Sequence, residues 1–254
     1  MASKVLKNYI NTLHSITNKT SNVEYTILSP LGEGAYGVVF KVRSEFGTYA
    51  AKFQPLIYAE KTFENEIEVY KRISKFPYCN NYIICLHDHF TLNFPILGEI
   101  GILIMELMEG DADENPEPLT LTIDILHALS ALHSLNIKHG DLALQNIFYK
   151  TTKFGKIYKL GDFGFSKLNA VPKNIKIENQ RFGILLAEIL YPEDLVDTEL
   201  RFAEVEEIIS KKPPSLLRKI ILGLVSGEWD TEKCLDYIIK IQKSNINDMF
   251  KSIR

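Results

Sequence analysis

The chain of 254 residues is poor in cysteine, and the few cysteines exclude two classes of protein. Cys79, Cys85 and Cys234 are an odd set without a C-x-x-C pair, so neither a disulfide framework nor a zinc site is indicated. No apolar run approaches the roughly 20 residues that a membrane helix needs, and the N-terminus has no unbroken apolar signal region. We therefore expect a cytoplasmic protein of a reducing compartment, without a transmembrane segment.

An excess of either charge is also lacking, because 29 basic and 32 acidic residues leave a formal net charge of −3. This balance gives no general attraction to nucleic acid, so no nucleic-acid partner is expected. Hydrophobic residues make up 46% and charged residues 24% of the chain, which is typical of a globular protein and excludes disorder of the whole chain. The length suffices for one large domain or two small lobes.

Hydrophobic periodicity divides the chain into a short extension, a β-rich part and a helical part. The residues at helical spacing within the extension, residues 1–24, are Leu6, Ile10, Leu13 and Thr17. They predict an amphipathic helix that packs on the main fold, with a partner-binding or membrane-surface helix as the alternative. Three alternating runs within residues 25–53, separated by glycine-bearing turns, predict an antiparallel meander.

Further elements are expected after the meander. Residues 60–75 have one apolar helical face, and residues 96–107 have the composition of a strand. The acidic, proline-bearing residues 109–118 are typical of a loop, and helical periodicity dominates from Leu119 onward. A β-rich segment followed by a helical one predicts an α+β fold with two lobes.

A glycine-rich turn is the first candidate for binding chemistry. Gly32, Gly34 and Gly37 form a G-x-G-x-x-G pattern, and glycine permits close backbone approach to a phosphate because it has no Cβ. The pattern alone is weak, and a plain tight turn would also produce it. A strand rather than a helix follows, which favours a loop over ATP phosphates rather than a dinucleotide-binding turn.

A lysine in the next strand is the second candidate. Lys52 ends the run Ala50-Ala51-Lys52 and, beside a phosphate loop, is interpreted as a cation for nucleotide phosphates. Such a lysine needs a carboxylate to fix it, and Glu66 on the apolar-faced helix is the preferred partner. Glu64 and Glu68 are near alternatives that should point elsewhere.

Two acidic motifs follow in the second half of the chain. In the stretch from His139 to Asn146, Asp141 can accept the proton of an attacking hydroxyl, and Asn146 can hold a metal ion. In Asp162-Phe163-Gly164, which follows a strand-like run, the Asp162 carboxylate can bind Mg²⁺ between β- and γ-phosphates.

With all four motifs in order, the sequence resembles a eukaryotic-type protein kinase over about residues 25–190. The resemblance implies a protein-kinase-like two-lobed α+β fold with ATP and Mg²⁺ as cofactors. It implies a β-rich N-lobe (25–105), a hinge at about 106–108 and a reduced helical C-lobe (109–254), after the extension 1–24.

The resemblance also assigns roles to individual residues. Lys52 would bind the α- and β-phosphates and pair with Glu66, and Asp141 would orient and deprotonate the acceptor hydroxyl. Asn146 and Asp162 would hold Mg²⁺. The nucleotide would be bound by the glycine turn and by residues beside the adenine and at the hinge, namely Gly32, Gly34, Gly37, Val39, Ala50, Lys52, Met105, Glu106 and Met108.

The sequence departs from the family pattern at several places. Gly140 replaces the arginine of H-R-D, which normally pairs with a phosphorylated activation loop. Only 19 positions separate Gly164 from Gly183, the glycine expected on the central helix, and no A-P-E motif lies between them. Glu178 stands where that helix usually carries aspartate, and Ala143 replaces the lysine of serine/threonine kinases. The family member indicated is therefore minimal and atypical, of a viral or pathogen-effector kind.

The expected activity is transfer of the γ-phosphate to a protein, on serine or threonine, without control by activation-loop phosphorylation. The expected partners are a protein substrate, such as a folded host protein, and an activating or docking partner, with the host cytoplasm as the location for a viral or effector protein. Two alternatives stay open. H-G-D-L also occurs in antibiotic phosphotransferases and in the small kinase of the tRNA-modifying KEOPS complex, so a small-molecule kinase fits. A nucleotide-binding pseudokinase or scaffold is the other alternative.

Overall fold

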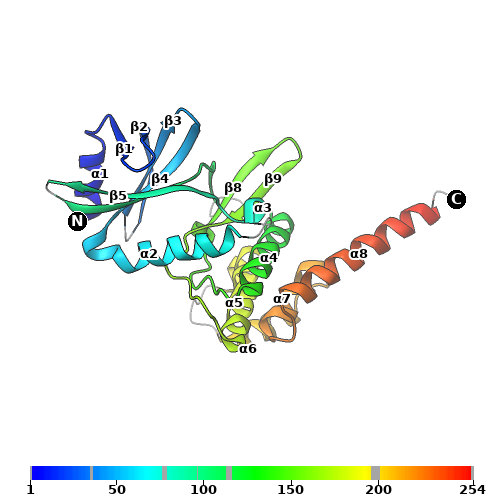
Figure 1. The fold of residues 1–254 in the computed structure, drawn as a ribbon. Coiled ribbons are helices and arrows are strands. Elements are labelled where there is room, and N and C mark those ends of the chain that lie inside the picture. The colour runs from blue at the N-terminus through cyan, green and yellow to red at the C-terminus, as the bar shows by residue number, and fades with distance from the viewer. Residues whose placement is uncertain are drawn as a thin grey trace. The chain divides into compact units, whose positions relative to one another are not determined.

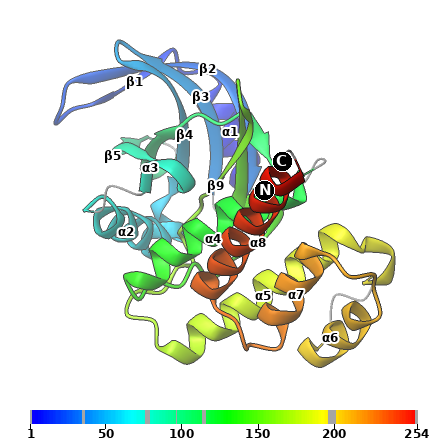
Figure 2. The ribbon, with the colours of Figure 1, turned by 90° about the vertical axis from the view of Figure 1, so that its right-hand side faces the viewer.

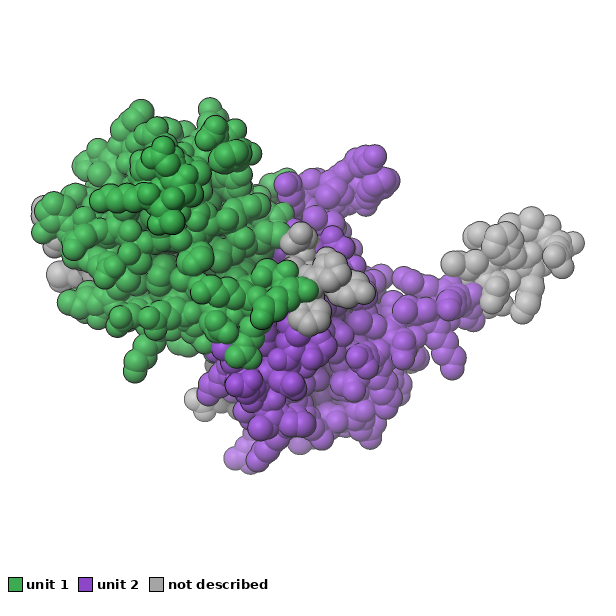
Figure 3. Space-filling view, in the orientation of Figure 1, with its two compact units in different colours: residues 1–80, 84–109, 162–165 green, residues 81–83, 110–161, 166–254 purple. Residues whose placement is uncertain are grey.

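The computed structural model describes residues 2–34, 37–75, 79–95, 97–112, 116–195 and 201–252. The chain forms two compact units (Figure 3). Unit 1 comprises residues 1–80, 84–109 and 162–165, and unit 2 comprises residues 81–83, 110–161 and 166–254. The segment 162–165, remote in sequence, therefore belongs to unit 1.

Unit 1 is built on a six-stranded antiparallel sheet with the strand order β1-β2-β3-β4-β6-β5 (Figure 1). The strands are β1 (Ser15–Asn18), β2 (Val23–Gly34), β3 (Gly37–Ser44), β4 (Gly47–Pro55), β5 (Leu86–Phe94) and β6 (Gly98–Glu106). The antiparallel pairing of β2, β3 and β4 confirms the predicted meander. The predicted strand within residues 96–107 is confirmed as β6.

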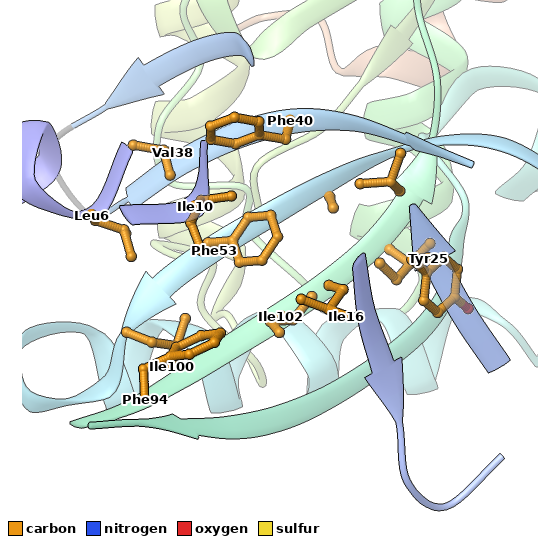
Figure 4. Close-up of a cluster of buried hydrophobic side chains, with 13 residues drawn as sticks. Leu6, Ile10, Ile16, Tyr25, Val38, Phe40, Phe53, Phe94, Ile100 and Ile102 are labelled. Atoms are coloured by element: carbon orange, nitrogen blue, oxygen red, sulfur yellow. The ribbon is translucent and has the colours of Figure 1, made fainter. Parts of the chain in front are cut away.

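The two faces of this sheet carry different side chains, because successive residues of a strand point to opposite sides. One face holds Phe40, Phe53 and Ile102, all fully buried, and is covered by Leu6 and Ile10 of helix α1 (Ala2–Ile10), as Figure 4 shows. On the other face Leu103 packs against Phe63 and Ile67 of helix α2 (Leu56–Ile73). The sheet thus separates α1 from α2.

The N-terminal extension is only partly helical, which corrects the expectation for residues 1–24. The helix ends at Ile10, and Thr17 lies in β1, which pairs with β2 from Ser15 opposite Thr26 onward. Leu6 and Ile10 are both fully buried in the core of unit 1, so this helix packs on the main fold as the primary interpretation proposed. Residues 1–24 belong to unit 1 rather than to a separate part.

Unit 2 is mainly helical. Its helices and strands, with the short helix α3 that begins in unit 1, are α3 (Cys79–Tyr82), β7 (Gly110–Asp111), α4 (Pro118–Ser134), η1 (Leu144–Asn146), β8 (Ile147–Thr152), β9 (Gly155–Leu160), α5 (Pro172–Leu190), η2 (Pro192–Asp194), α6 (Phe202–Ser210), α7 (Leu216–Val225) and α8 (Thr231–Ser252). Both α4 and α5 begin with proline, whose fixed φ suits the first helical turn. Helices α5 and α7 lie side by side (Figure 2), and a Cβ at Gly183 would come within 2.8 Å of Val225.

No helix of the described ranges combines the length and the apolar character that crossing a bilayer requires.

Candidate active site

The glycine-rich turn connects β2 to β3, with Gly32 and Gly34 in β2 and Gly37 at the start of β3. Ala35 and Tyr36 at its tip lie outside the described residues. A Cβ at Gly37 would lie 2.1 Å from the Phe53 carbonyl oxygen, so the packing of unit 1 itself demands glycine there. A Cβ at Gly32 or Gly34 would meet no described atom within 4 Å, so the fold leaves open space at the two positions proposed to face phosphate.

The sheet register places the predicted adenine-side residues on the same face as Lys52. Val39 of β3 stands opposite Lys52 of β4, and Ala50 of β4 stands opposite Met105 of β6. Because residues directly opposite share a face and residues two apart on a strand do too, all four point to the face covered by α2. Val39, Lys52 and Met105 are half-buried, whereas Ala50 is buried.

The predicted hinge follows β6, which ends at Glu106. The backbone N–H of Glu106 donates to the Cys85 carbonyl oxygen at 2.9 Å, which fixes the end of the strand. Met108 lies beyond it in irregular chain and is half-buried. The boundary of unit 1 falls after Glu109, immediately beyond the segment proposed as hinge.

Lys52, Glu66 and Asp162 form a cluster of ionised groups in unit 1. The Lys52 Nζ atom lies 2.9 Å from Glu66 Oε2 and 2.9 Å from Asp162 Oδ1. The exposed fraction of the side chain is 12% for Lys52 and zero for Glu66, but 39% for Asp162. Asp162 is therefore the most exposed of the three side chains.

Burial and charge oppose each other in this cluster. Burial alone would lower the pKa of Lys52, but the carboxylates of Glu66 and Asp162 outweigh it and raise the pKa above that of free lysine. Burial raises the pKa of Glu66, and the neighbouring Lys52 ammonium opposes this rise. Lys52 thus stays a cation, as a phosphate-binding lysine must.

The Asp162-Phe163-Gly164 segment is held against α2. Asp162 has φ = 58°, in the left-handed region that non-glycine residues seldom adopt. The fully buried Phe163 ring meets the Tyr70 ring edge-on, with centroids 5.1 Å apart and planes at 83°. The Asn65 side-chain amide donates to the carbonyl oxygens of Phe163 and Gly164, each at 3.2 Å. Sequence reasoning missed Asn65, because only the tertiary fold brings position 65 to position 163.

In unit 2, the loop after α4 carries Asp141 and Asn146. The Asn146 side-chain amide donates to the Asp141 carbonyl oxygen at 2.8 Å and to its Oδ2 at 3.0 Å. The buried His139 ring supports the loop, since its Nε2 lies 2.9 Å from the Gly161 carbonyl oxygen. That carbonyl can only accept, which assigns the Nε2 proton and leaves Nδ1 to accept from the Asp141 N–H at 3.3 Å.

Glu178 of α5 holds the same loop by accepting hydrogen bonds from its backbone. Its Oε2 accepts from the His139 N–H at 3.0 Å and contacts His133 Nε2 at 2.9 Å, while its Oε1 accepts from the Gly140 N–H at 2.8 Å. Burial alone would raise the pKa of Glu178, but these hydrogen bonds and the nearby histidines lower it below the ordinary 4.5. The sequence pattern marked position 178 but gave no sign of His133.

Gly140 adopts φ = 87°, a conformation that favours glycine. The position that departs from H-R-D therefore has a backbone for which glycine is the least strained residue. The segment from Phe165 to Val171, which follows Gly164, is short. It is bonded to the chain just before His139, because Lys138 and Lys167 exchange two backbone hydrogen bonds, of 2.9 and 2.8 Å. Helix α5 begins directly after it, at Pro172.

The side chains fit Mg²⁺ and ATP in their chemistry. Mg²⁺ prefers oxygen ligands and is usually bound by one or two carboxylates together with substrate phosphates. In unit 1, Asp162 offers a partly exposed carboxylate. In unit 2, Asn146 offers an amide oxygen, because its amide nitrogen is the atom that donates to Asp141. Within the described ranges no group of three His, Cys, Asp or Glu side chains could hold an ion by itself.

Comparison with known proteins identifies the family. The family model for the protein kinase domain matches residues 25–183. The chain is 29% identical over 146 residues to the "Probable serine/threonine-protein kinase zyg-1" of Caenorhabditis elegans, covering 56% of this chain and 20% of that protein. It is 32% identical over 157 residues to human calcium/calmodulin-dependent protein kinase type 1B, covering 58% of this chain and 44% of that protein.

Among solved structures, that of vaccinia related kinase 3 aligns with a TM-score of 0.65, at 13% identity, over 96% of each chain. At this identity the likeness concerns the fold alone. The family model covers more than half of the chain, and the chain therefore belongs to the protein kinase family, with a β-rich and a helical part as that fold requires. The chain spans less than half the length of the kinases from the worm and from human that it matches.

Proposed function

We propose that this chain is an ATP- and Mg²⁺-dependent protein kinase that transfers the γ-phosphate to a serine or threonine hydroxyl of a protein. The observation that carries the proposal is the Lys52 ammonium, fixed 2.9 Å from both the buried Glu66 and the partly exposed Asp162. Phosphoryl transfer asks little covalent chemistry of the protein and depends on positioning and charge neutralisation. A lysine that is kept charged and oriented by two carboxylates suits that task.

The other roles follow from the chemistry of the side chains. Bound ATP supplies the phosphoryl group, and Mg²⁺ neutralises its developing charge. Asp162 and Asn146 would offer oxygens to the metal ion, and Lys52 would contact the phosphates. Asp141, oriented by the Asn146 amide at 3.0 Å, would accept the proton of the acceptor hydroxyl.

Serine or threonine is proposed as the acceptor because the relative from Caenorhabditis elegans is named as a probable serine/threonine-protein kinase. Ala143 in place of the usual lysine does not by itself favour this acceptor, so this relative carries this part of the proposal.

Activity without phosphorylation of the segment 165–171 is a further part of the proposal. Ser166 is its only hydroxyl side chain; it is 5% exposed and donates to the His139 carbonyl oxygen at 3.0 Å. A kinase acting on this segment would therefore meet no accessible hydroxyl. Gly140 also offers no cation with which a phosphate could pair.

A small-molecule acceptor is the second candidate, and one observation favours it. Only seven residues separate Gly164 from α5 at Pro172, so little chain is present where protein kinases form a platform for substrate peptides. The same catalytic residues would then act on a small hydroxyl compound.

The test is incubation of the purified chain with Mg²⁺, γ-labelled ATP, generic protein acceptors and cell lysate, beside Asp141→Ala. Protein-bound label that is absent from the variant, and phosphoserine or phosphothreonine on hydrolysis, are expected. Label on small molecules alone would favour the second candidate. Nucleotide binding with no transfer in any fraction would contradict both and leave a binding module.

A further inference from the structure

The backbone of Asp162 is strained, and something must hold it. A non-glycine residue at φ = 58° costs free energy and persists only where its surroundings determine the conformation. In many protein kinases a phosphorylated activation segment contributes to this determination. Here the following segment, 165–171, offers no exposed hydroxyl, so the support must come from elsewhere.

Helix α2 supplies the support through several of its side chains. Glu66 reaches Asp162 through Lys52, and Tyr70, one turn further, packs its ring against Phe163. Asn65, adjacent to Glu66, contacts the backbone itself: its amide nitrogen lies 3.2 Å from the carbonyl oxygens of both following residues, 163 and 164.

Thr62 of α2 also lies beside this segment. It lies one turn before Glu66, and a Cβ at Gly164 would stand 3.5 Å from the Thr62 Cβ, an ordinary contact distance. The Gly164 N–H in turn points to Asp162 Oδ1 at 3.4 Å. Asn65 differs from these neighbours because it bonds to two successive carbonyl groups and so fixes the orientation of two peptide planes.

We propose that Asn65 is a positioning residue that holds the 162–164 backbone in the conformation that presents the Asp162 carboxylate to Mg²⁺ and nucleotide, in place of a phosphorylated segment. This inference rests on the proposed function. Asn65 would act through its bonds to the backbone that follows Asp162, rather than by touching phosphate or the reacting hydroxyl. Its loss should therefore lower the population of the binding-competent conformation, and the apparent affinity for the metal–nucleotide complex should fall in proportion.

The prediction separates Asn65 from a merely structural residue. Asp162 meets the nucleotide through the metal ion, so loss of Asn65 should weaken ADP binding in the presence of Mg²⁺ and leave ADP binding in EDTA unchanged. A general loosening of unit 1 would weaken both. The side chain of Asn65 is half-buried, so Asn65→Leu keeps its size without burying a new polar group.

The experiment is calorimetric titration of the full chain with ADP, with excess Mg²⁺ and with EDTA, alongside thermal unfolding and hydrogen exchange of residues 162–165. The variants are Asn65→Leu, Asn65→Gln as the conservative rescue, and Glu64→Leu, an exposed neighbour on the same helix, as the control. We expect Asn65→Leu to reduce the Mg²⁺-dependent gain in affinity about five- to tenfold, the size expected for one lost hydrogen-bonding group. Exchange at 162–165 should quicken, and Asn65→Gln should recover part of the gain.

The outcomes distinguish the inference from the proposed function. A wild type whose ADP affinity ignores Mg²⁺ and that transfers no phosphate would overturn the proposed function, and this inference with it. A Mg²⁺-dependent wild type with an equal gain in Asn65→Leu would overturn the inference alone. An equal loss of affinity with and without Mg²⁺ would also overturn it, because it would mark a general structural role.

Discussion

The ammonium group of Lys52 lies 2.9 Å from a carboxylate oxygen of Glu66, whose side chain is completely buried. Fourteen positions separate the two residues, one on strand β4 and one on helix α2, so this ion pair fastens the helix to the sheet. A buried carboxylate is costly without its cation, so the pair contributes to the stability of unit 1 as well as to the proposed function.

The first prediction separates these two contributions. We expect Lys52→Met to lower the free energy of unfolding by about 3 kcal/mol, because it leaves Glu66 buried without its cation. The double variant Lys52→Met/Glu66→Leu should regain most of that stability, since apolar side chains can replace a buried ion pair at little cost. Phosphate transfer should be absent from both variants, because both lack the Lys52 ammonium. Urea unfolding measures the difference, and a double variant less stable than the single one would contradict the account.

The second prediction uses two glycines of the same turn. Gly37→Ala should destabilise the chain by about 2 kcal/mol, because the new Cβ would lie 2.1 Å from the Phe53 carbonyl oxygen. Gly34→Ala meets no described atom within 4 Å and should change stability by less than about 0.5 kcal/mol. It should nevertheless weaken nucleotide binding, by filling space proposed for a phosphate. Equal unfolding temperatures for the two variants would be the contrary result.

The third prediction concerns the N-terminal helix. Ile10 is fully buried in the core of unit 1, and Ile10→Ala should cost about 3 kcal/mol. Val5 on the same helix is 50% exposed, so Val5→Ala should cost little. Thermal unfolding of both variants measures this contrast. If Ile10→Ala unfolded at the wild-type temperature, α1 would be an accessory helix rather than part of the core.

The fourth prediction follows from the lowered pKa of Glu178. A carboxylate whose pKa is lower in the folded than in the unfolded state stabilises the fold at a pH above its unfolded pKa of 4.5. This stabilisation is lost as the pH falls through the pKa of the folded state. At neutral pH, Glu178→Gln should be less stable than wild type. A carboxylate accepts hydrogen bonds at both oxygens, from the Gly140 N–H at one and from the His139 N–H and His133 at the other, whereas an amide has only one accepting oxygen.

The difference in unfolding free energy between wild type and Glu178→Gln should therefore narrow as the pH falls below 4.5 towards the lower pKa that Glu178 has in the folded state. Chemical unfolding at a series of pH values measures it, with Glu188→Gln on the same helix as the control, because burial raises the pKa of that carboxyl instead. A gap that is constant over this range would show that the charge of Glu178 is not what stabilises the loop.

Much of the fold could be predicted because its signals are local. The apolar face of residues 60–75 predicted the helix that forms α2, and its positions Phe63, Ile67, Tyr70 and Ile73 are all buried. The β1 strand was missed because Thr17 continued a helical spacing, whereas its pairing with Glu24 is a tertiary fact. Local periodicity cannot tell a short edge strand from the end of a helix.

The candidate site divides in the same way. Lys52 and Asp162 were proposed from motifs and Glu66 from its place on the apolar-faced helix, and the structure brings both carboxylates to within hydrogen-bonding distance of the Lys52 ammonium. Asn65 and His133 were not identified, because neither lies in a motif and each acts on a residue far away in the chain. Contacts of this kind depend on how helix faces pack, which no spacing along the sequence encodes.

The most direct test of the central claim is the rate of γ-phosphate transfer by wild type, Asp141→Ala and Asp162→Asn, measured side by side with Mg²⁺ and γ-labelled ATP. Circular dichroism would establish that all three are folded. The account predicts transfer by the wild type that falls by a factor of about 10² or more in each variant, because one loses the proton acceptor and the other a ligand of the metal. Wild-type transfer no faster than that of the variants would contradict it.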